Sequence, residues 1–284
     1  MAVVEAKGLT YAYPGRTEAS LQDVSLTVEE GEFALLTGPS GCGKTTLCRC
    51  FNGLIPHFYG GKLEGDLVVA GLSVADRPIR DLAQHVGLVF QNPENQLFAL
   101  SVEKDVAFGL ENLGVARGEI RKRVDWALEM TGIGDLRERT PHELSGGQQQ
   151  RVAIASVLAM HPKVMVLDEP TSFLDPLGAQ TIFSVIDGLN RRLGITVILV
   201  EHRLDLASQY ADHVIVMDEG RVVLDGGPRE IFSSEEARLI GVGIPKATML
   251  YRFLEEQGIH SGTVPVNSKE ASQLLREALV LDRG

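Results

Sequence analysis

Apolar positions along the chain fall into short runs with two different periodicities. Residues 25–28 (Ser-Leu-Thr-Val) alternate polar and apolar, which is typical of a strand with one buried face. Residues 33–36 and 86–90 are continuously apolar, which favours strands buried on both faces. Strand patterns return at 164–167, 196–200 and 214–217. The first ninety residues and the stretch after about 160 are therefore predicted to supply buried strands.

Between residues 92 and 159 the pattern becomes helical. One predicted helix, which Gly132 can end, has a single apolar face formed by Ile120, Val124, Ala127 and Leu128. A later helix separates two strand patterns and carries Leu177, Ile182, Val185, Ile186 and Leu189. Strands that alternate with helices predict a parallel sheet with helices on its faces, so the helical middle is interpreted as an insertion into an α/β domain.

After about Pro228 the pattern predicts two short amphipathic helices. The first is marked by Leu250, Phe253 and Leu254, and the second by Ala271, Leu274, Leu275, Ala278 and Leu279. An Asn267/Glu270 pair at the start of the second helix resembles a capping box. These features predict a small appended helical domain.

Composition and charge narrow the class of protein. The 284 residues are 44% hydrophobic and 23% charged, as in ordinary folded proteins, and the formal net charge of −11 argues against broad binding to nucleic acid or anionic lipid. The apolar run 195–200 is far shorter than the ~20 residues that span a bilayer, and the first residues lack an export signal. We expect a cytoplasmic protein. Cys42, Cys48 and Cys50 crowd into nine residues and are predicted to be packed, reduced thiols.

A phosphate-binding loop is the strongest chemical signal. Gly38-x-x-x-x-Gly43-Lys44-Thr45 follows a predicted strand and opens a predicted helix from about Thr45 to Phe51. In that context the glycine amides converge on phosphate oxygens, Lys44 reaches the β- and γ-phosphates, and Thr45 offers a hydroxyl to Mg²⁺. A chance glycine-rich turn is the alternative, and the placement between strand and helix argues against it.

Two carboxylates complete the predicted hydrolytic site. Asp168 and Glu169 end the apolar strand at 164–167. Alone, such a pair would usually be a solvated loop start. Beside a phosphate loop, Asp168 is predicted to bind Mg²⁺ and Glu169 to orient and polarise the water that attacks the γ-phosphate.

A second anion site is predicted at residues 144–148 (Leu-Ser-Gly-Gly-Gln). Ser145 and the glycine amides precede a helical run through Val152 and Val157, so they would meet an anion at a helix N-terminus. One ATP cannot easily need both phosphate sites from a single subunit.

These motifs resemble those of the nucleotide-binding subunits of ATP-binding-cassette transporters, and the resemblance covers Ala2 to about Phe232. It implies two subunits paired head to tail, with residues 144–148 of one closing over the ATP held by the other. It further implies that Tyr13 stacks on adenine, with Tyr11 as a rival, and that Asp175 communicates across the pair. Gln91 and His202 would join Glu169 in catalysis, Gln91 by linking γ-phosphate and Mg²⁺ to a membrane partner and His202 by contacting the γ-phosphate.

The resulting site assignment has three groups. The residues expected to bind nucleotide are Tyr13, Gly38, Pro39, Ser40, Gly41, Cys42, Gly43, Lys44, Thr45, Thr46, Ser145, Gly147 and Gln148. Those expected to hold Mg²⁺ are Thr45, Gln91 and Asp168, and those expected in catalysis are Glu169, His202 and Gln91.

Residues 90–98 and the tail from Ile240 to Leu279 further resemble the ATPases of energy-coupling-factor transporters, which import vitamins or, in related systems, cobalt or nickel ions. This implies a second ATPase subunit (a copy or a paralogue), a transmembrane scaffold and a separate membrane component that captures substrate, at the cytoplasmic face of the membrane. Two residues depart from the general pattern: Phe173 stands where a small residue is common, and Glu201 where Thr or Ser is frequent.

The fold expected from the resemblance is the α/β P-loop NTPase cassette, with a RecA-like core, an inserted helical subdomain and a small C-terminal helical domain. The cassette would span 1–230, with the core at 1–91 and 160–230 and the helical subdomain at 92–159. Residues 231–284 would form the C-terminal domain, either as a contact between ATPase subunits or as a structural cap.

Other functions remain open from sequence alone. A soluble cassette ATPase acting on DNA, ribosomes or a scaffold usually carries two cassettes, a coiled-coil insertion or basic arms, and none of these is present. The ATPase of another importer type is a further alternative. A non-catalytic regulatory subunit is disfavoured because Lys44, Asp168, Glu169 and His202 are all present.

Overall fold

The computed structural model describes residues 1–258 and 262–281, with side chains described up to residue 276. The strands are β1 Ala2–Ala12, β2 Leu21–Glu29, β3 Phe33–Thr37, β4 Lys62–Val69, β5 Leu72–Ser73, β6 Val86–Val89, β7 Val164–Asp168, β8 Thr196–Val200, β9 His213–Asp218 and β10 Arg221–Gly226. The helices are α1 Lys44–Phe51, α2 Leu54–His57, α3 Ile79–Leu82, α4 Val102–Asn112, α5 Arg117–Met130, α6 Gly146–Leu158, α7 Pro176–Leu193, α8 Leu204–Ala207, α9 Pro228–Ser233, α10 Glu235–Leu239, α11 Lys246–Glu256 and α12 Ser268–Leu281. Short 3₁₀ turns lie at Pro93–Asn95, Gly134–Leu136 and Pro141–Glu143.

The predicted parallel sheet forms the centre of the molecule. Its strand order is β10-β9-β3-β8-β7-β6, and all neighbours run parallel except β10, which is antiparallel to β9. Every residue of β3, β7 and β8 is buried, which explains their continuous apolar sequences. The carboxyl ends of these strands lie at one edge of the sheet and lead into the phosphate loop, the Glu169 loop and the His202 loop.

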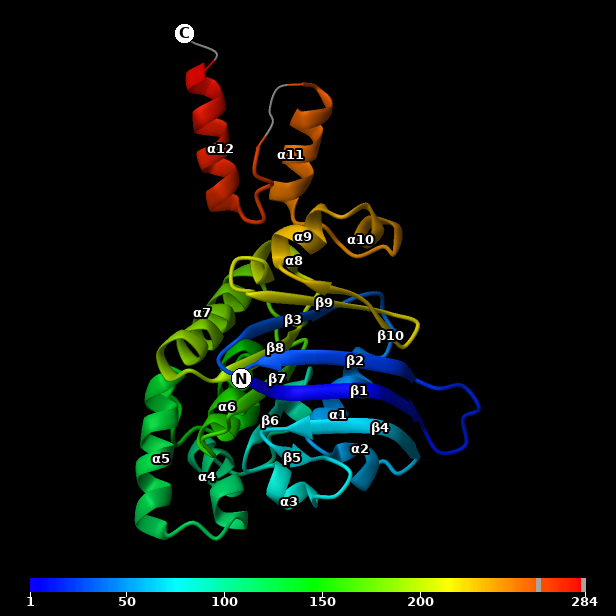
Figure 1. Cartoon of the computed structure of the whole chain (residues 1–284). Helices are drawn as coiled ribbons and strands as arrows, with labels where there is room; N and C mark the ends of the chain where they lie inside the picture. The colour runs from blue at the N-terminus through cyan, green and yellow to red at the C-terminus, as the bar shows by residue number, and fades with distance from the viewer. Residues whose placement is uncertain (259–261, 282–284) are drawn as a thin grey trace.

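A second sheet departs from the sequence prediction of helices on both faces of one sheet. Strands β2-β1-β4-β5 pair antiparallel, and α1 contacts β4 of this sheet as well as β6 and β7 of the parallel one. Buried side chains of both sheets and of α1 form one apolar cluster. Strands β1, β2, β4 and β5 therefore form a separate layer that packs on α1, the helix after the phosphate loop (Figure 1).

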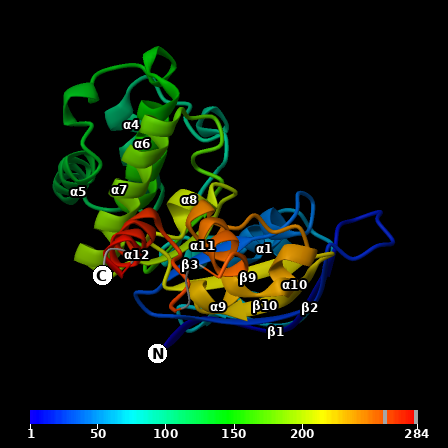
Figure 2. The same ribbon diagram turned by 90° about the horizontal axis from the view of Figure 1, so that it is seen from above.

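The inserted helices α4, α5 and α6 follow β6 and precede β7, as the helical pattern predicted. They pack on one another, and α6 also contacts β6 and α7. Seen from above, they lie to one side of the sheets (Figure 2). No helix in the described residues is both long and apolar enough to cross a membrane. The residue boundaries of the subdomains stay a prediction.

The C-terminal segment contains more helices than the two predicted. Helices α9 and α10 precede the predicted pair α11 and α12, because Gly227-Pro228 and Ser234 provide two further helix starts. Asn267 caps α12 by accepting a hydrogen bond from the Glu270 backbone N–H. Helices α11 and α12 extend away from the sheets (Figure 1). The side chains of Ala278 and Leu279 lie outside the described residues.

Candidate functional site

The phosphate loop joins β3 to α1 with a backbone that requires glycine. Gly38, Gly41 and Gly43 have positive φ angles of 141°, 81° and 108°. A Cβ atom at Gly38 would lie 2.0 Å from the Met217 carbonyl oxygen, and one at Gly43 would lie 2.7 Å from the Ser20 carbonyl oxygen. The loop is thus fixed between the β9 end and the β1–β2 connection, with the N-terminus of the eight-residue α1 behind it.

Lys44 lies under this loop and is 5% exposed. Its Nζ donates to the carbonyl oxygens of Gly38 at 2.9 Å and Pro39 at 2.8 Å. The Cys42 Sγ lies 3.8 Å from the same nitrogen, and burial raises the pKa of the Cys42 thiol, an effect that the Lys44 ammonium opposes. The loop therefore holds a buried positive charge at the point where it would meet phosphate.

Asp168 lies at the end of β7 beside Thr45. Burial raises the pKa of the Asp168 carboxyl, whereas a hydrogen bond from the Thr45 side chain lowers it. The Asp168 Oδ1 atom is buried and has no hydrogen-bond partner among the described residues. A hydroxyl beside a carboxylate oxygen with a free lone pair is a hard-oxygen pair that suits Mg²⁺. The residues present fit the predicted ion.

Glu169 stands at the centre of the predicted catalytic group. Its Oε1 lies 3.0 Å from His202 Nε2, and its Oε2 accepts from Gln91 Nε2 at 2.8 Å. The Ser172 hydroxyl also donates to Oε2 at 2.8 Å. Glu169 has a left-handed backbone with φ of 50°, so its side chain leaves the β7 end in a direction that a strand residue would not adopt. The structure thus joins the three predicted catalytic side chains.

Ser172 is a site residue that sequence reasoning missed. It follows Glu169 by three residues, and its backbone N–H donates to the Glu169 carbonyl oxygen at 3.2 Å in a tight turn. A serine three residues after a predicted base is a weak signal, because many loops contain one. The turn geometry is what directs its hydroxyl to the Glu169 carboxylate.

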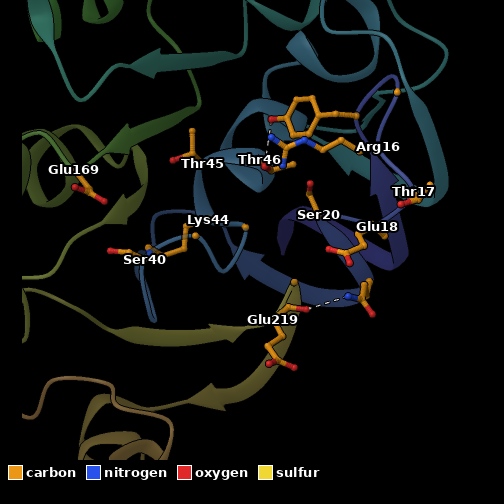
Figure 3. A pocket seen from close by; sticks show the side chains of 17 residues that line it. Arg16, Thr17, Glu18, Ser20, Ser40, Lys44, Thr45, Thr46, Glu169 and Glu219 are labelled. Carbon is orange, nitrogen blue, oxygen red and sulfur yellow. Dashed lines mark hydrogen bonds between the residues drawn. The ribbon is translucent and has the colours of Figure 1, made fainter.

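A cavity of about 940 Å³ opens in front of the phosphate loop. Figure 3 shows Ser40, Lys44 and Thr45 on one side of it and Arg16, Thr17 and Glu18 on the other. Of the predicted nucleotide-binding residues, those that line it are Tyr13, Ser40, Gly41, Gly43, Lys44, Thr45 and Thr46, and Glu169 lies at the same cavity. Gly38, Pro39 and Cys42 form the loop behind this surface.

The two candidate tyrosines differ in their access to the cavity. Tyr11 is fully buried and its hydroxyl donates to the Gly60 carbonyl oxygen, so it has no face open to the cavity. Tyr13 lines the cavity, with its ring packed edge-on against the rings of Tyr11 and Tyr59. Arg49 donates to the Tyr13 hydroxyl at 3.1 Å and holds the ring at this edge. The adenine role of Tyr13 stays a prediction.

The predicted second anion site lies elsewhere. Ser145 caps α6 in a capping box with Gln148, and Gly147 is in its first turn. Ser145 and Gly146 are exposed, and none of the residues 145–148 lines the cavity at the phosphate loop. The chain therefore does not bring its two predicted anion sites together.

Asp175 begins α7, and its Oδ1 accepts from the Gly178 backbone N–H at 2.7 Å. The preceding Phe173 is 71% exposed, and Leu177 is 72% exposed on the first turn. The start of α7 therefore presents apolar side chains to solvent. Leu177 lies in the helix that the sequence predicted, but it is not among the buried residues of that helix.

Comparisons with known proteins agree with this geometry. The protein family described as ABC transporter matches residues 21–172. The energy-coupling factor transporter ATP-binding protein EcfA1 of Caldanaerobacter subterraneus is 44% identical over 262 residues, covering 90% of this chain and 92% of that protein. The structure of CbiO1 from Clostridium perfringens, part of the ABC transporter complex CbiONQ, has a TM-score of 0.74 at 39% identity and covers 88% of this chain and 99% of that chain. The ATP-binding cassette MJ0796, as a dimer bound to ADP and phosphate, has a TM-score of 0.68 at 31% identity over 79% of this chain and 98% of that chain.

Proposed function

Because this chain belongs to the ABC transporter family and is an ATP hydrolase, we propose that it powers uptake of a micronutrient, a vitamin or a transition-metal ion, through an energy-coupling-factor type membrane transporter. The observation that carries the proposal is that Glu169, which lines the phosphate-loop cavity, is joined by hydrogen bonds to His202 and Gln91. The similarity to EcfA1 and CbiO1 supports the transporter type. The chain would work at the cytoplasmic face of the membrane.

Hydrolysis would proceed by in-line attack of water on the γ-phosphate. Glu169 would orient that water and take its proton, while His202, at 3.0 Å from the Glu169 carboxylate, would contact the γ-phosphate oxygens. Lys44 and the loop amides would stabilise the charge on the phosphates. Thr45, Asp168 and the amide oxygen of Gln91 would hold Mg²⁺, which when bound neutralises phosphate charge.

We propose that two ATPase subunits complete each other's sites. Ser145, Gly147 and Gln148 would close over the nucleotide of the second subunit, because none of them lines the cavity of its own chain. The similar MJ0796 cassette is a dimer with ADP and phosphate, which supports such pairing. ATP would favour the closed pair and ADP would not, so hydrolysis would reopen it.

The membrane partner would dock beside Gln91. Phe98 and Phe108 are 61% and 44% exposed and pack edge to face at 4.6 Å, and Leu100 is 78% exposed. The buried Asp105 carboxylate fixes this loop by accepting from the backbone N–H groups of Phe98 and Ala99. An apolar surface held rigid a few residues after Gln91 suits a contact with a membrane scaffold.

The tail, assigned to residues 231–284, would extend the contact between ATPase subunits. Met249, Leu250 and Phe253 of α11 are 57%, 40% and 59% exposed, whereas Thr248 and Tyr251 are buried. A purely structural cap would turn the apolar side chains inward, so their exposure favours a subunit contact. We propose the cassette boundary at residue 230 with the core and helical parts as predicted.

Co-purification tests the proposal. The tagged chain, expressed with its chromosomal neighbours and extracted in mild detergent, should retain a membrane scaffold, a substrate-capturing membrane protein and a second ATPase subunit. The double variant Phe98→Ser/Leu100→Ser should no longer co-purify with the membrane proteins. It should still bind ATP, because neither residue lines the nucleotide cavity. Lys104→Ser, on an adjacent exposed position, is the matched control. Recovery of ribosomes or nucleic acid in place of membrane proteins would contradict the transporter function.

A further inference from the structure

A buried carboxylate lies directly before His202 and has no part in the proposed chemistry. Glu201 follows β8 and is 1% exposed, and it does not line the nucleotide cavity. Burying a carboxylate is costly unless hydrogen bonds compensate it. Its position therefore requires an explanation in the structure around it.

The Glu201 carboxylate accepts hydrogen bonds from both active-site loops. Its Oε2 accepts from the Thr171 hydroxyl at 2.6 Å, and Thr171 is fully buried. Its Oε1 accepts from the backbone N–H groups of His202 at 3.0 Å and Arg203 at 3.1 Å. One side chain thus joins the loop after β7 to the loop after β8.

Two further contacts join the same loops on either side of this carboxylate. The Glu169 backbone N–H donates to the Val200 carbonyl oxygen at 3.0 Å. The Arg203 guanidinium donates to the Leu174 carbonyl oxygen at 2.6 Å. The loop after β7 is therefore bonded to the loop after β8 along its whole length, from Glu169 to Leu174, the residue before Asp175.

We propose that Glu201 is a positioning residue that locks the His202 loop to the loop carrying Glu169 and Asp175. This inference rests on the proposed hydrolytic roles of Glu169 and His202. Because all three donors meet one desolvated carboxylate, loss of any of them leaves a buried polar group unpaired. When nucleotide closes the pair of subunits, the lock makes three groups move as one unit: the His202 imidazole, the Glu169 carboxylate and Asp175.

This arrangement affects turnover rather than nucleotide affinity. Neither Glu201 nor Thr171 lines the cavity that would hold ATP, and the Thr171 hydroxyl donates to Glu201. A displaced His202 would misalign the transition state, and a misplacement of about 1 Å can cost on the order of 100-fold in rate. A change in kcat with an unchanged KM is therefore the expected signature.

Two pairs of variants test the connection in the assembled complex. Thr171→Val keeps the shape but removes the hydroxyl, and should lower kcat about tenfold with KM for ATP within about twofold. Thr171→Ser keeps the hydroxyl and should stay close to wild type. Glu201→Ala should behave like Thr171→Val, whereas Glu201→Gln can still accept from both backbone N–H groups and pair with Thr171, and should keep most of the activity.

Combination with His202→Ala separates positioning from general destabilisation. If Glu201 acts by aligning His202 with Glu169, Thr171→Val and Glu201→Ala will cause a much smaller loss of kcat in the His202→Ala background than in the wild type. A full additional loss there, or a wild-type kcat in either folded variant, would overturn the inference. If one variant does not fold, the other decides. Absence of ATP hydrolysis by the wild-type complex would instead contradict the proposed function.

Discussion

Glu169→Gln is the substitution whose outcome the site geometry defines most closely. Glu169 Oε2 receives two donors, Gln91 Nε2 and the Ser172 hydroxyl, whereas Oε1 faces His202 Nε2. A glutamine must place its carbonyl oxygen at the Oε2 position and its NH₂ group towards His202. The imidazole can accept there when its proton is on Nδ1. The substitution thus keeps the hydrogen-bond geometry and removes the base.

The expected loss is in the chemical step. General-base catalysis contributes about 10²- to 10⁴-fold, so kcat should fall by that factor, which corresponds to about 3 to 5 kcal/mol in the barrier. ATP affinity should change little, because the phosphates would be held by Lys44 and the loop amides. The closed pair of subunits should accumulate with ATP because the reopening step is blocked.

Steady-state phosphate release and size-exclusion chromatography with ATP measure these two effects. Ser172→Ala is the control, since it removes one donor but leaves the carboxylate; its loss should stay below about tenfold. A Glu169→Gln variant that turns over within about twofold of wild type would refute the assignment of Glu169 as the base.

Three further predictions concern other parts of the chain. Lys44→Ala should weaken ATP binding by roughly tenfold or more in a fluorescent-nucleotide titration, because a charge-assisted contact is lost; unchanged hydrolysis would contradict the phosphate-loop assignment. Cys42 should react slowly with N-ethylmaleimide at pH 7, since burial raises its pKa, and MgATP should slow the reaction further; full activity of the labelled protein would count against its place in the loop. His213 pairs with Asp225 and Glu32, and chiefly the hydrogen bond with Asp225 raises its pKa, so its stabilisation is complete below about pH 6.5 and is lost as pH rises through the raised folded value. His213→Gln should therefore lower Tm at pH 6 and less so at higher pH; an equal Tm deficit at every pH would contradict this.

The phosphate loop and the buried strands could be predicted because their signals are local. A strand buried on both faces is continuously apolar in sequence. Gly38 and Gly43 are required because a Cβ atom at either position would collide with a backbone carbonyl oxygen, and the motif itself specifies glycine there. Asp168 and Glu169 follow from the same logic, since the strand that precedes them is unambiguous. The sequence signals of these elements are local even where, as for Gly38 and Met217, the contact that requires the residue is distant in sequence.

The second sheet and the helices α9 and α10 were missed for a different reason. The pairing of β1 with β4 is set by contacts across about fifty to sixty-five residues, and no short pattern reports it. Helices α9 and α10 are too short to show a clear apolar period. Both helix starts nevertheless carry a recognisable sequence signal: Pro228 is at the first position of α9, and Ser234 is the N-cap of α10.

Contacts between loops were likewise invisible in the sequence. Nothing in the spacing of Thr171 and Glu201 indicates that their side chains meet, because β7 and β8 become neighbours only in the folded sheet. The burial of Tyr11, the rival to Tyr13, also became visible only in the fold, since it is set by the place of Tyr11 on β1.

In the proposed pair of subunits, Ser145 serves the nucleotide site of the second ATPase subunit. Asp and Asn both cap helices well, so Ser145→Asp and Ser145→Asn should each preserve the start of α6, which Ser145 caps. Only Asp places a negative charge against the γ-phosphate of the partner's nucleotide, at a cost of several kcal/mol.

The deciding measurement is the ATP hydrolysis rate of the purified complex carrying each variant. The complex with Ser145→Asp should hydrolyse ATP on the order of 100-fold more slowly than the complex with Ser145→Asn, since each decade in rate corresponds to 1.36 kcal/mol. Equal wild-type rates for Asp and Asn would mean that one chain holds a complete site, and would contradict the account.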